Sequence, residues 1–395
     1  MRASGQATRS PGPTPRRRVL MVAGEASGDL HGADLLRALH ERLPDVEVVG
    51  IGGEHCRAAG MRALADASET GTVGLVEGAR ALGTLVRSYR ALARMLRDDP
   101  PDLCVLIDFP EFNLRLARLA KRAGVPVLYY IAPQVWAWRR GRVRKIARRV
   151  DRLAVVFPFE PGLYAARLPG VEFVGHPLLD RVAVTRGREE TLRAHGLDPV
   201  RRLVVLLPGS RTKEIDYILP SMVGAVARLA ADHPDLQFAL ALAHTLSEQH
   251  VAPRLAAAGV PIPVVRDDMH NLVAAAELAL VASGTATLEC ALLEKPMVIV
   301  YRLSRVTFAL ARLLVRGVDH VGMPNIVAGR AVVPELLQRD ATGARIAAEA
   351  RAILDDPARR ATMIGELREV RRRLGRGGAA RRAAAIAAEM MGAGS

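Results

Sequence analysis

The stretch LALVASGTATLECALLEKPMVIVYR, residues Leu278 to Arg302, alternates segments typical of strands and helices. It opens with an apolar run of strand length, which the polar turn Ser283, Gly284, Thr285 interrupts. A segment of helical composition follows, Pro296 ends it, and a second apolar run completes the stretch. A strand, a tight turn, a helix and another strand in this order predict a parallel α/β unit.

The turn in this stretch is a candidate phosphate site. The helix after it begins with free backbone N–H groups beside two hydroxyls and a glycine, and such a helix start attracts phosphate. Glu289 lies four residues past Thr285, about one helical turn away, where a carboxylate suits a ribose diol. A plain helix cap followed by a surface glutamate explains the same residues, so the stretch alone leaves both interpretations open.

Composition narrows the class of protein. Of 395 residues, 50% are hydrophobic and 25% are charged, as in ordinary globular proteins, and the length suits two or three domains. The net charge of +15 favours an anionic partner, either nucleic acid, a membrane surface or a phosphorylated substrate. The three cysteines have no metal or redox spacing, which indicates a reducing, cytoplasmic compartment. No apolar run reaches transmembrane length.

The first half begins, after a basic leader (1–16) that we expect to be disordered, with a strand at 19–23 and the glycine-rich turn GEASGDLHG. This turn matches neither the dinucleotide fingerprint nor a P-loop. A later strand (103–107) ends at Asp108, and a carboxylate between a buried strand and a proline-containing turn is a candidate general base. A turn-forming aspartate that caps the next helix is the alternative.

The second half repeats this layout, with a strand at 203–207, the turn PGSR ending at Arg211, and a helix. Arg211 at a helix start is placed to neutralise a phosphate. The sequence therefore predicts two Rossmann-like α/β domains that face each other across a cleft. Because the candidate phosphate sites lie in the second half and Asp108 in the first, we expect an acceptor-binding domain over 17–185 and a domain that binds a nucleotide sugar over 186–340. We expect covering or dimer-forming helices over 341–395.

Two segments suggest partners. Residues 73–97 carry apolar side chains at helical spacing with arginines away from that stripe, which fits a surface helix or a contact with anionic lipid. Residues 136–149 combine tryptophan with many basic side chains, which fits nucleic acid, a phosphorylated and partly apolar substrate, or a solvated basic helix. No Asp-x-Asp pair and no cluster of His, Cys and Asp has metal spacing, so we expect no metal.

Seven motifs, in this order, resemble those of the lipid-A-disaccharide synthase family. They are GEASGD, DFPEFN, PQVWAWR, FVGHP, LLPGSR, ASGTATLE and MPNIVAGR, and they span roughly residues 17–340. The resemblance implies a glycosyltransferase-B (GT-B) fold. It also implies transfer of 2,3-diacylglucosamine from UDP to the 6-hydroxyl of 2,3-diacylglucosamine 1-phosphate (lipid X), with inversion, in lipid A biosynthesis.

The resemblance also assigns roles to residues. Asp108 matches the family's catalytic aspartate, and Arg211 and Asn325 match positions needed for activity. The residues expected to hold UDP are Ser283, Gly284, Thr285, Glu289, Gly209, Ser210 and Arg302. The implied partners are UDP-2,3-diacylglucosamine, lipid X and the cytoplasmic face of the inner membrane through residues 73–97. The helices expected over 341–395 suggest, apart from the resemblance, a second copy of the chain. No cofactor and no nucleic acid are expected.

Two alternatives remain beside this hypothesis. An isomerase of the same fold, similar to UDP-N-acetylglucosamine 2-epimerase, needs no acyl-chain groove, and activity on a soluble UDP-sugar distinguishes it. A non-catalytic RNA-binding module rests on residues 136–149 and predicts strongly salt-dependent RNA binding, but it leaves the glycine-rich turns and Asp108 unexplained.

Overall fold

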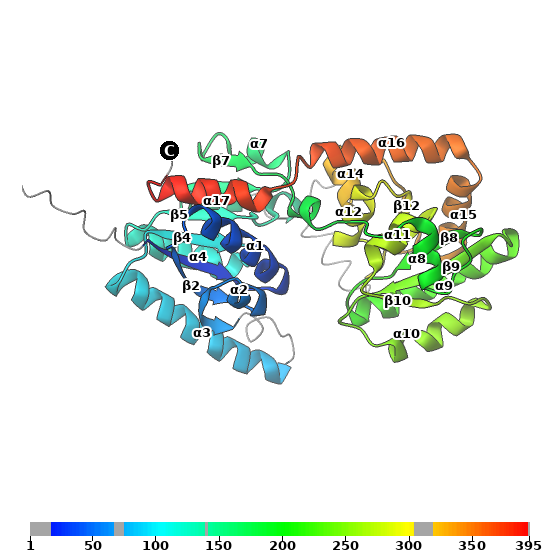
Figure 1. Ribbon diagram of the computed structural model, residues 1–395, viewed down its shortest axis with the longest axis horizontal. Coiled ribbons are helices and arrows are strands. Elements are labelled where there is room, and N and C mark those ends of the chain that lie inside the picture. The colour runs from blue at the N-terminus through cyan, green and yellow to red at the C-terminus, as the bar shows by residue number, and fades with distance from the viewer. Residues whose placement is uncertain (1–16, 67–74, 139–140, 304–318, 394–395) are drawn as a thin grey trace, which may run out of the picture.

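The computed structural model describes residues 17–66, 75–138, 141–303 and 319–393 (Figure 1). The predicted leader and the first two residues of the 73–97 segment lie outside these ranges. The prediction of two parallel α/β units is confirmed, because the described chain forms two separate parallel sheets, each covered by helices.

The first sheet has seven strands in the order β3-β2-β1-β4-β5-β6-β7, and every pairing is parallel. In the middle of the sheet, β4 (LCVLI) and β5 (VLYY) consist of buried residues only, as expected for a sheet with both faces covered. The strands are β1 (Arg18–Ala23), β2 (Glu47–Gly52), β3 (Arg62–Asp66), β4 (Leu103–Ile107), β5 (Val127–Tyr130), β6 (Arg152–Val155) and β7 (Val171–Phe173).

Helices cover both faces of this sheet, and β1 shows how the core is divided. Val19 and Met21 pack in one cluster with residues of α1, whereas Leu20 and Val22 pack in the other with residues of α3 and α4. This follows from the alternation of side chains along a strand. The helices are α1 (Ala26–Arg42), α2 (Glu54–Ala58), α3 (Leu75–Asp98), α4 (Pro110–Arg122), α5 (Val135–Trp138), α6 (Arg142–Ala147) and α7 (Glu160–Tyr164).

The second sheet has six parallel strands in the order β10-β9-β8-β11-β12-β13. They are β8 (Arg202–Leu207), β9 (Leu236–Leu242), β10 (Val264–Arg266), β11 (Leu278–Ala282), β12 (Met297–Tyr301) and β13 (Glu335–Leu337). The helices around them are α8 (Arg188–Ala194), α9 (Thr212–Asp232), α10 (Glu248–Leu255), α11 (Met269–Ala275), α12 (Thr285–Leu292), α14 (Met323–Ala328), α15 (Gly343–Leu354) and α16 (Pro357–Arg373).

The chain crosses between the two domains twice. After the short 3-10 helix η1 (Pro177–Asp180), Arg181 is bound to Asp34 of the first domain, whereas the backbone of Thr185 is bound to Asn271 of the second. The second crossing follows α16, and the last helix, α17 (Ala379–Met390), returns to pack against α1 (Figure 1). The two crossings touch, because His176 N donates to Leu374 O at 3.0 Å.

Among the described residues, no helix has both the length and the apolar composition that spanning a bilayer requires.

Candidate active site

The predicted site residues follow strands at the points where each sheet reverses its order. In the first sheet, the strands that follow β1 in the chain (β2, β3) lie on one side of it, and β4 and the later strands lie on the other side. The switch point is therefore between β1 and β4. In the second sheet, β8 and β11 flank the equivalent point. Ligands of open α/β sheets bind beyond the carboxyl ends of strands at such points. Asp108 follows β4, Arg211 follows β8, and residues 283–285 follow β11.

Asp108 is held by its main chain in an uncommon conformation. Its φ is 44° and that of Phe109 is 47°, both in the left-handed region that residues other than glycine seldom adopt. The Asp108 carbonyl accepts hydrogen bonds from Tyr129 Oη at 2.5 Å and from Asn113 Nδ2 at 2.7 Å, and both of these side chains are buried. These bonds hold the turn through the main chain of Asp108.

The electrostatic surroundings of Asp108 suit a base. The side chain is half-buried, and burial is the main cause that raises the pKa of the Asp108 carboxyl to about 6. The negative charge of Glu25, the residue that precedes α1, raises this pKa further, whereas a backbone hydrogen bond from Phe109 lowers it. A carboxylate whose pKa lies close to neutrality is a more effective proton acceptor than an ordinary surface aspartate.

The two turns at this switch point touch each other. A Cβ atom built on Gly24 would overlap the ring of Phe109, so only glycine lets the turn after β1 pass this close to the turn after β4. Phe109 in turn stacks on Phe112 of α4, with 5.3 Å between ring centroids. The glycine-rich turn thus fixes the residue next to Asp108, a relationship that the sequence did not reveal.

The backbone at the start of α12 is open to solvent. Gly284 precedes the helix with φ 156°, and a Cβ built on it would meet no atom within 4 Å. Gly284 and Thr285 are exposed, while Ser283 Oγ donates to Val321 O at 3.1 Å. The first N–H groups of a helix have no partner within it, so this end of α12 can donate to an anion. Figure 1 shows α12 and α14 on the side of the second domain that faces the first.

Glu289 lies one turn into α12 and has a partner that the sequence did not indicate. His270 Nε2, at the start of α11, lies 3.3 Å from Glu289 Oε1, and both side chains are largely buried. This contact fixes the direction of the carboxylate. No local pattern indicates this partner, because the nearness of His270 to Glu289 depends on where α11 lies relative to α12.

In the turn after β8, the backbone N–H groups are bound by the side chain of Glu214. Glu214 Oε2 accepts from the backbone N–H of Ser210 at 2.9 Å and of Arg211 at 3.3 Å. Gly209 has φ 116°, and a Cβ there would overlap the Glu214 carboxylate. The donor left for a ligand is the Arg211 guanidinium, which is 83% exposed and 3.7 Å from Glu214 Oε1. Arg211 therefore differs from residues 283–285, which offer backbone groups.

Arg302 and Tyr301 lie at the end of β12, beside these turns. Arg302 is exposed and its Nη1 donates to Ser221 Oγ of α9 at 3.2 Å. Burial is the main cause that raises the pKa of the Tyr301 hydroxyl, the charge of Glu214 adds to the rise, and Arg211 opposes it. Tyr301 thus lies within electrostatic reach of Arg211 and is a residue that sequence reasoning missed.

Asn325 is a buried residue of α14. Its side chain is fully buried, Oδ1 accepts from the N–H of Val332 and Val333, and Nδ2 donates to Val333 O and to Glu335 Oε1. Glu335 also accepts from the N–H groups of Val321 and Gly322, each at 2.9 Å. Since Ser283 is bonded to Val321 O, Asn325 supports the turn before α12 through two intermediates.

The comparison with protein families gives a match over nearly the whole chain. The model of the lipid-A-disaccharide synthetase family matches residues 19–390. A lipid-A-disaccharide synthase of Geobacter metallireducens is 49% identical over 381 residues, which are 96% of this chain and 99% of that protein. The corresponding enzyme of Geobacter sulfurreducens is 48% identical over 375 residues, 95% of this chain and 97% of that protein.

Solved structures resemble the fold at low identity. A putative UDP-N-acetylglucosamine 2-epimerase from Listeria monocytogenes has a TM-score of 0.67 at 14% identity and covers 96% of this chain and 98% of its own. A calicheamicin glycosyltransferase has a TM-score of 0.61 at 17% identity, covering 96% and 99%. The resemblance to the synthase family and the GT-B fold inferred from the motifs are therefore confirmed. The chain belongs to the lipid-A-disaccharide synthase family, glycosyltransferases of lipid A biosynthesis with the GT-B fold.

Proposed function

We propose that the chain transfers 2,3-diacylglucosamine from UDP to the 6-hydroxyl of 2,3-diacylglucosamine 1-phosphate, with inversion at the anomeric carbon. The observation that carries this proposal is the half-buried carboxylate of Asp108 at the switch point of the first sheet, with its pKa raised to about 6. The second domain supplies the other half of the site, an exposed helix start and an exposed arginine.

Each domain contributes different groups to the reaction. The Asp108 carboxylate accepts the proton of the acceptor 6-hydroxyl while that oxygen forms a bond to the anomeric carbon of the donor sugar. The bond between this carbon and the diphosphate oxygen breaks, and UDP leaves with the electron pair. The backbone N–H groups at Gly284 and Thr285, together with the Arg211 guanidinium, offset the charge that develops on the diphosphate. Glu289, oriented by His270, holds the ribose diol, and no metal is part of this proposal.

The acyl chains of the two substrates bear on where in the cell the reaction takes place. Both sugars carry acyl chains, so we propose that the chain works on the cytoplasmic face of the inner membrane, with the 73–97 segment against the lipid. The backbone of α3 (Leu75–Asp98) forms most of this segment, and at its carboxyl end Leu92 and Leu96 point into the core. A membrane contact would therefore use the amino-terminal part of α3.

The test is incubation of the full chain with UDP-2,3-diacylglucosamine and 2,3-diacylglucosamine 1-phosphate. We expect UDP and a tetraacyl disaccharide 1-phosphate as products. Asp108→Asn should lower kcat by about 100-fold or more and leave UDP binding, measured by calorimetry, unchanged. Full turnover by this variant would remove Asp108 as the base.

One competing activity deserves a direct assay, because the solved structures of similar fold include UDP-N-acetylglucosamine 2-epimerases. Incubation with UDP-N-acetylglucosamine alone, followed by separation of the 2-epimers, distinguishes the two reactions. We expect no epimer, and epimer formation at a rate similar to disaccharide synthesis would favour the isomerase.

A further inference from the structure

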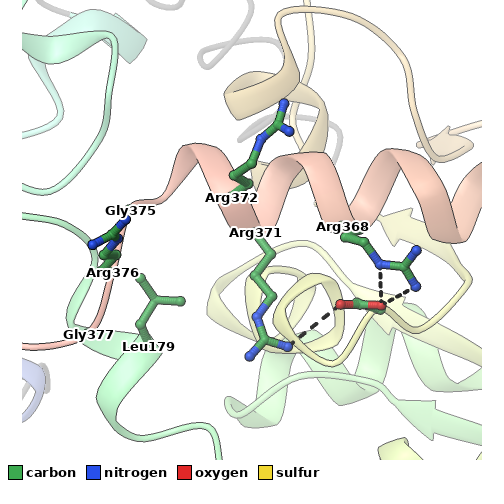
Figure 2. A pocket seen from close by; sticks show the side chains of 8 residues that line it. Leu179, Arg368, Arg371, Arg372, Gly375, Arg376 and Gly377 are labelled. Atoms are coloured by element: carbon green, nitrogen blue, oxygen red, sulfur yellow. Dashed lines mark hydrogen bonds and ion pairs between the residues drawn. The ribbon is translucent and has the colours of Figure 1, made fainter.

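A cavity of about 380 Å³ lies away from both switch points, between the end of α16 and the two domain crossings (Figure 2). Its volume falls within the range of small-molecule sites, roughly 300–1,000 Å³. None of the residues proposed to bind UDP or the acceptor lines it. The lining residues are Leu179, Glu294, Arg368, Arg371, Arg372, Gly375, Arg376 and Gly377.

The charge of the lining is strongly positive. Arg372 points to the other side of α16 and pairs with Glu369, so three arginines and a single carboxylate remain, a formal excess of two positive charges (three minus one). Arginines in the last turn of a helix are expected, because the helix dipole places about half a negative charge there. That half charge is too small to balance the excess, and Arg376 lies beyond the end of α16. The cavity therefore favours an anion with more than one negative charge.

The arginines differ in how much hydrogen-bonding capacity they have left. Arg368 binds Glu294 Oε2 through Nε at 3.1 Å and Nη2 at 2.9 Å, and Arg371 lies 3.8 Å from Glu294 Oε1 and donates to Leu292 O at 3.0 Å. Figure 2 shows both side chains directed to Glu294, whereas Arg372 points to the other side of α16. Arg372 is paired with Glu369.

Arg376 is the free cation of this group. Its side chain is exposed and forms no hydrogen bond or ion pair with another residue in the part of the chain that the structure describes. A guanidinium has five N–H donors, and Arg371 uses only a fraction of its own. Arg371 and Arg376 therefore have the donors that an oxyanion would need, and planar guanidinium groups match phosphate oxygens well.

The cavity also lies where the domains are joined. Leu179 belongs to the first crossing, Gly375 and Gly377 belong to the second, and Glu294 follows α12, the helix whose start is proposed to hold the diphosphate of UDP. A ligand in this cavity would touch both crossings and the end of α12 at once.

We propose that this cavity binds a small soluble anion of the phosphate or diphosphate class, held by Arg371 and Arg376 where the two domain crossings meet the end of α12. Figure 1 shows α16 and α3 on opposite sides of the molecule, so a surface resting on lipid through α3 turns the cavity away from it. This geometry favours a soluble anion over a lipid headgroup.

The test is calorimetric titration of the full chain with inorganic pyrophosphate, and Arg211→Ala, titrated in parallel, identifies any pyrophosphate that binds at the proposed nucleotide site instead. Arg376→Ala and Arg371→Ala should each weaken binding about tenfold, the loss expected for a charge-assisted contact. Arg359→Ala removes the same charge from α16 at a site where it pairs with Glu349, and it should change the affinity little. Equal weakening by Arg359→Ala and Arg376→Ala would overturn the proposal.

A second pair of variants tests the role of the single carboxylate. Glu294→Gln should tighten pyrophosphate binding because it removes the competing negative charge, and Glu349→Gln, with the same change in net charge outside the cavity, should not. A Glu294→Gln effect no larger than that of Glu349→Gln would contradict the site. Co-sedimentation with phosphatidylglycerol vesicles should be equal for the unmodified chain and Arg376→Ala. A selective loss in Arg376→Ala would instead assign the cavity to a lipid headgroup.

Discussion

Asn325 Nδ2 lies 2.7 Å from Glu335 Oε1, and this partly buried contact connects α14 to the start of β13. The same carboxylate accepts from the N–H groups of Val321 and Gly322. Asn325 thus has no donor left for a substrate, and any effect of its replacement on catalysis should pass through the loop that supports Ser283.

Asn325→Asp should therefore destabilise the fold. The change replaces a donor by an acceptor opposite Glu335, and each buried group left without a partner costs roughly 1–3 kcal/mol. Adding Glu335→Gln should restore part of this loss, because glutamine can donate to the new carboxylate. Urea unfolding of the two single variants and the double variant gives the coupling free energy. If the changes in unfolding free energy of the two single variants simply add in the double variant, the contact contributes nothing to stability.

His270→Ala should weaken binding of the UDP-sugar with little effect on the chemical step. Glu289 would lose the partner that orients it toward the ribose, so KM for the donor should rise roughly three- to tenfold while kcat stays within about twofold. His250→Ala is the control, because His250 forms a similar contact, 3.0 Å from Asp216 Oδ1, away from α12. A fall in kcat without a change in KM would place His270 in the reaction itself.

Gly24→Ala should lower kcat about tenfold or more, since small displacements of reacting groups have large effects on rate. The added methyl group would displace the Phe109 ring and with it the turn that presents Asp108. Gly28→Ala lies in the same glycine-rich segment, in the first turn of α1, but its Cβ would meet its nearest neighbours at 3.7 Å, an ordinary contact. The two variants should differ in kcat by this factor, and equal activities would show that the Gly24–Phe109 contact does not fix the base.

The pH dependence of kcat/KM should show an acidic limb near pH 6. Asp108 must be unprotonated to accept a proton, so activity should rise as pH passes its pKa of about 6 and then level off. Glu25→Gln removes a negative charge that raises this pKa, and it should move the limb to lower pH. Glu41→Gln, at the far end of the same helix, is the control with equal change in net charge. If the acidic limb of Glu25→Gln lies at the same pH as that of the unmodified chain, the limb belongs to a group other than Asp108.

Much of the fold could be predicted because buried parallel strands are continuous apolar runs. Residues 278–282 and 203–207 are such runs, and the turns after them ended in hydroxyl, glycine or arginine residues that suggested an anion site. Asp108 could be found from its position after a third run. In each case the signal was local, lying within a few residues of the strand end.

The contacts that were missed join residues brought together by strand order. Gly24 and Phe109 touch only because β1 lies beside β4, and Glu289 meets His270 only because α11 packs near α12. Asn325 was expected, from the family resemblance, to be needed for activity, but its partner Glu335 is ten residues away and no local pattern indicated the pairing. The Ala- and Arg-rich composition of the last fifty-five residues gave no indication that α15 and α16 cover one domain whereas α17 covers the other.

The return of α17 to α1 has a consequence for synthesis of the chain. The amino-terminal domain is not a continuous piece of sequence, so a ribosome that has already released all seven of its strands has not yet made the helix that shields α1. Until residues 379–390 emerge, they cannot cover the apolar side of α1. This surface is therefore exposed to aggregation while the whole second domain is translated.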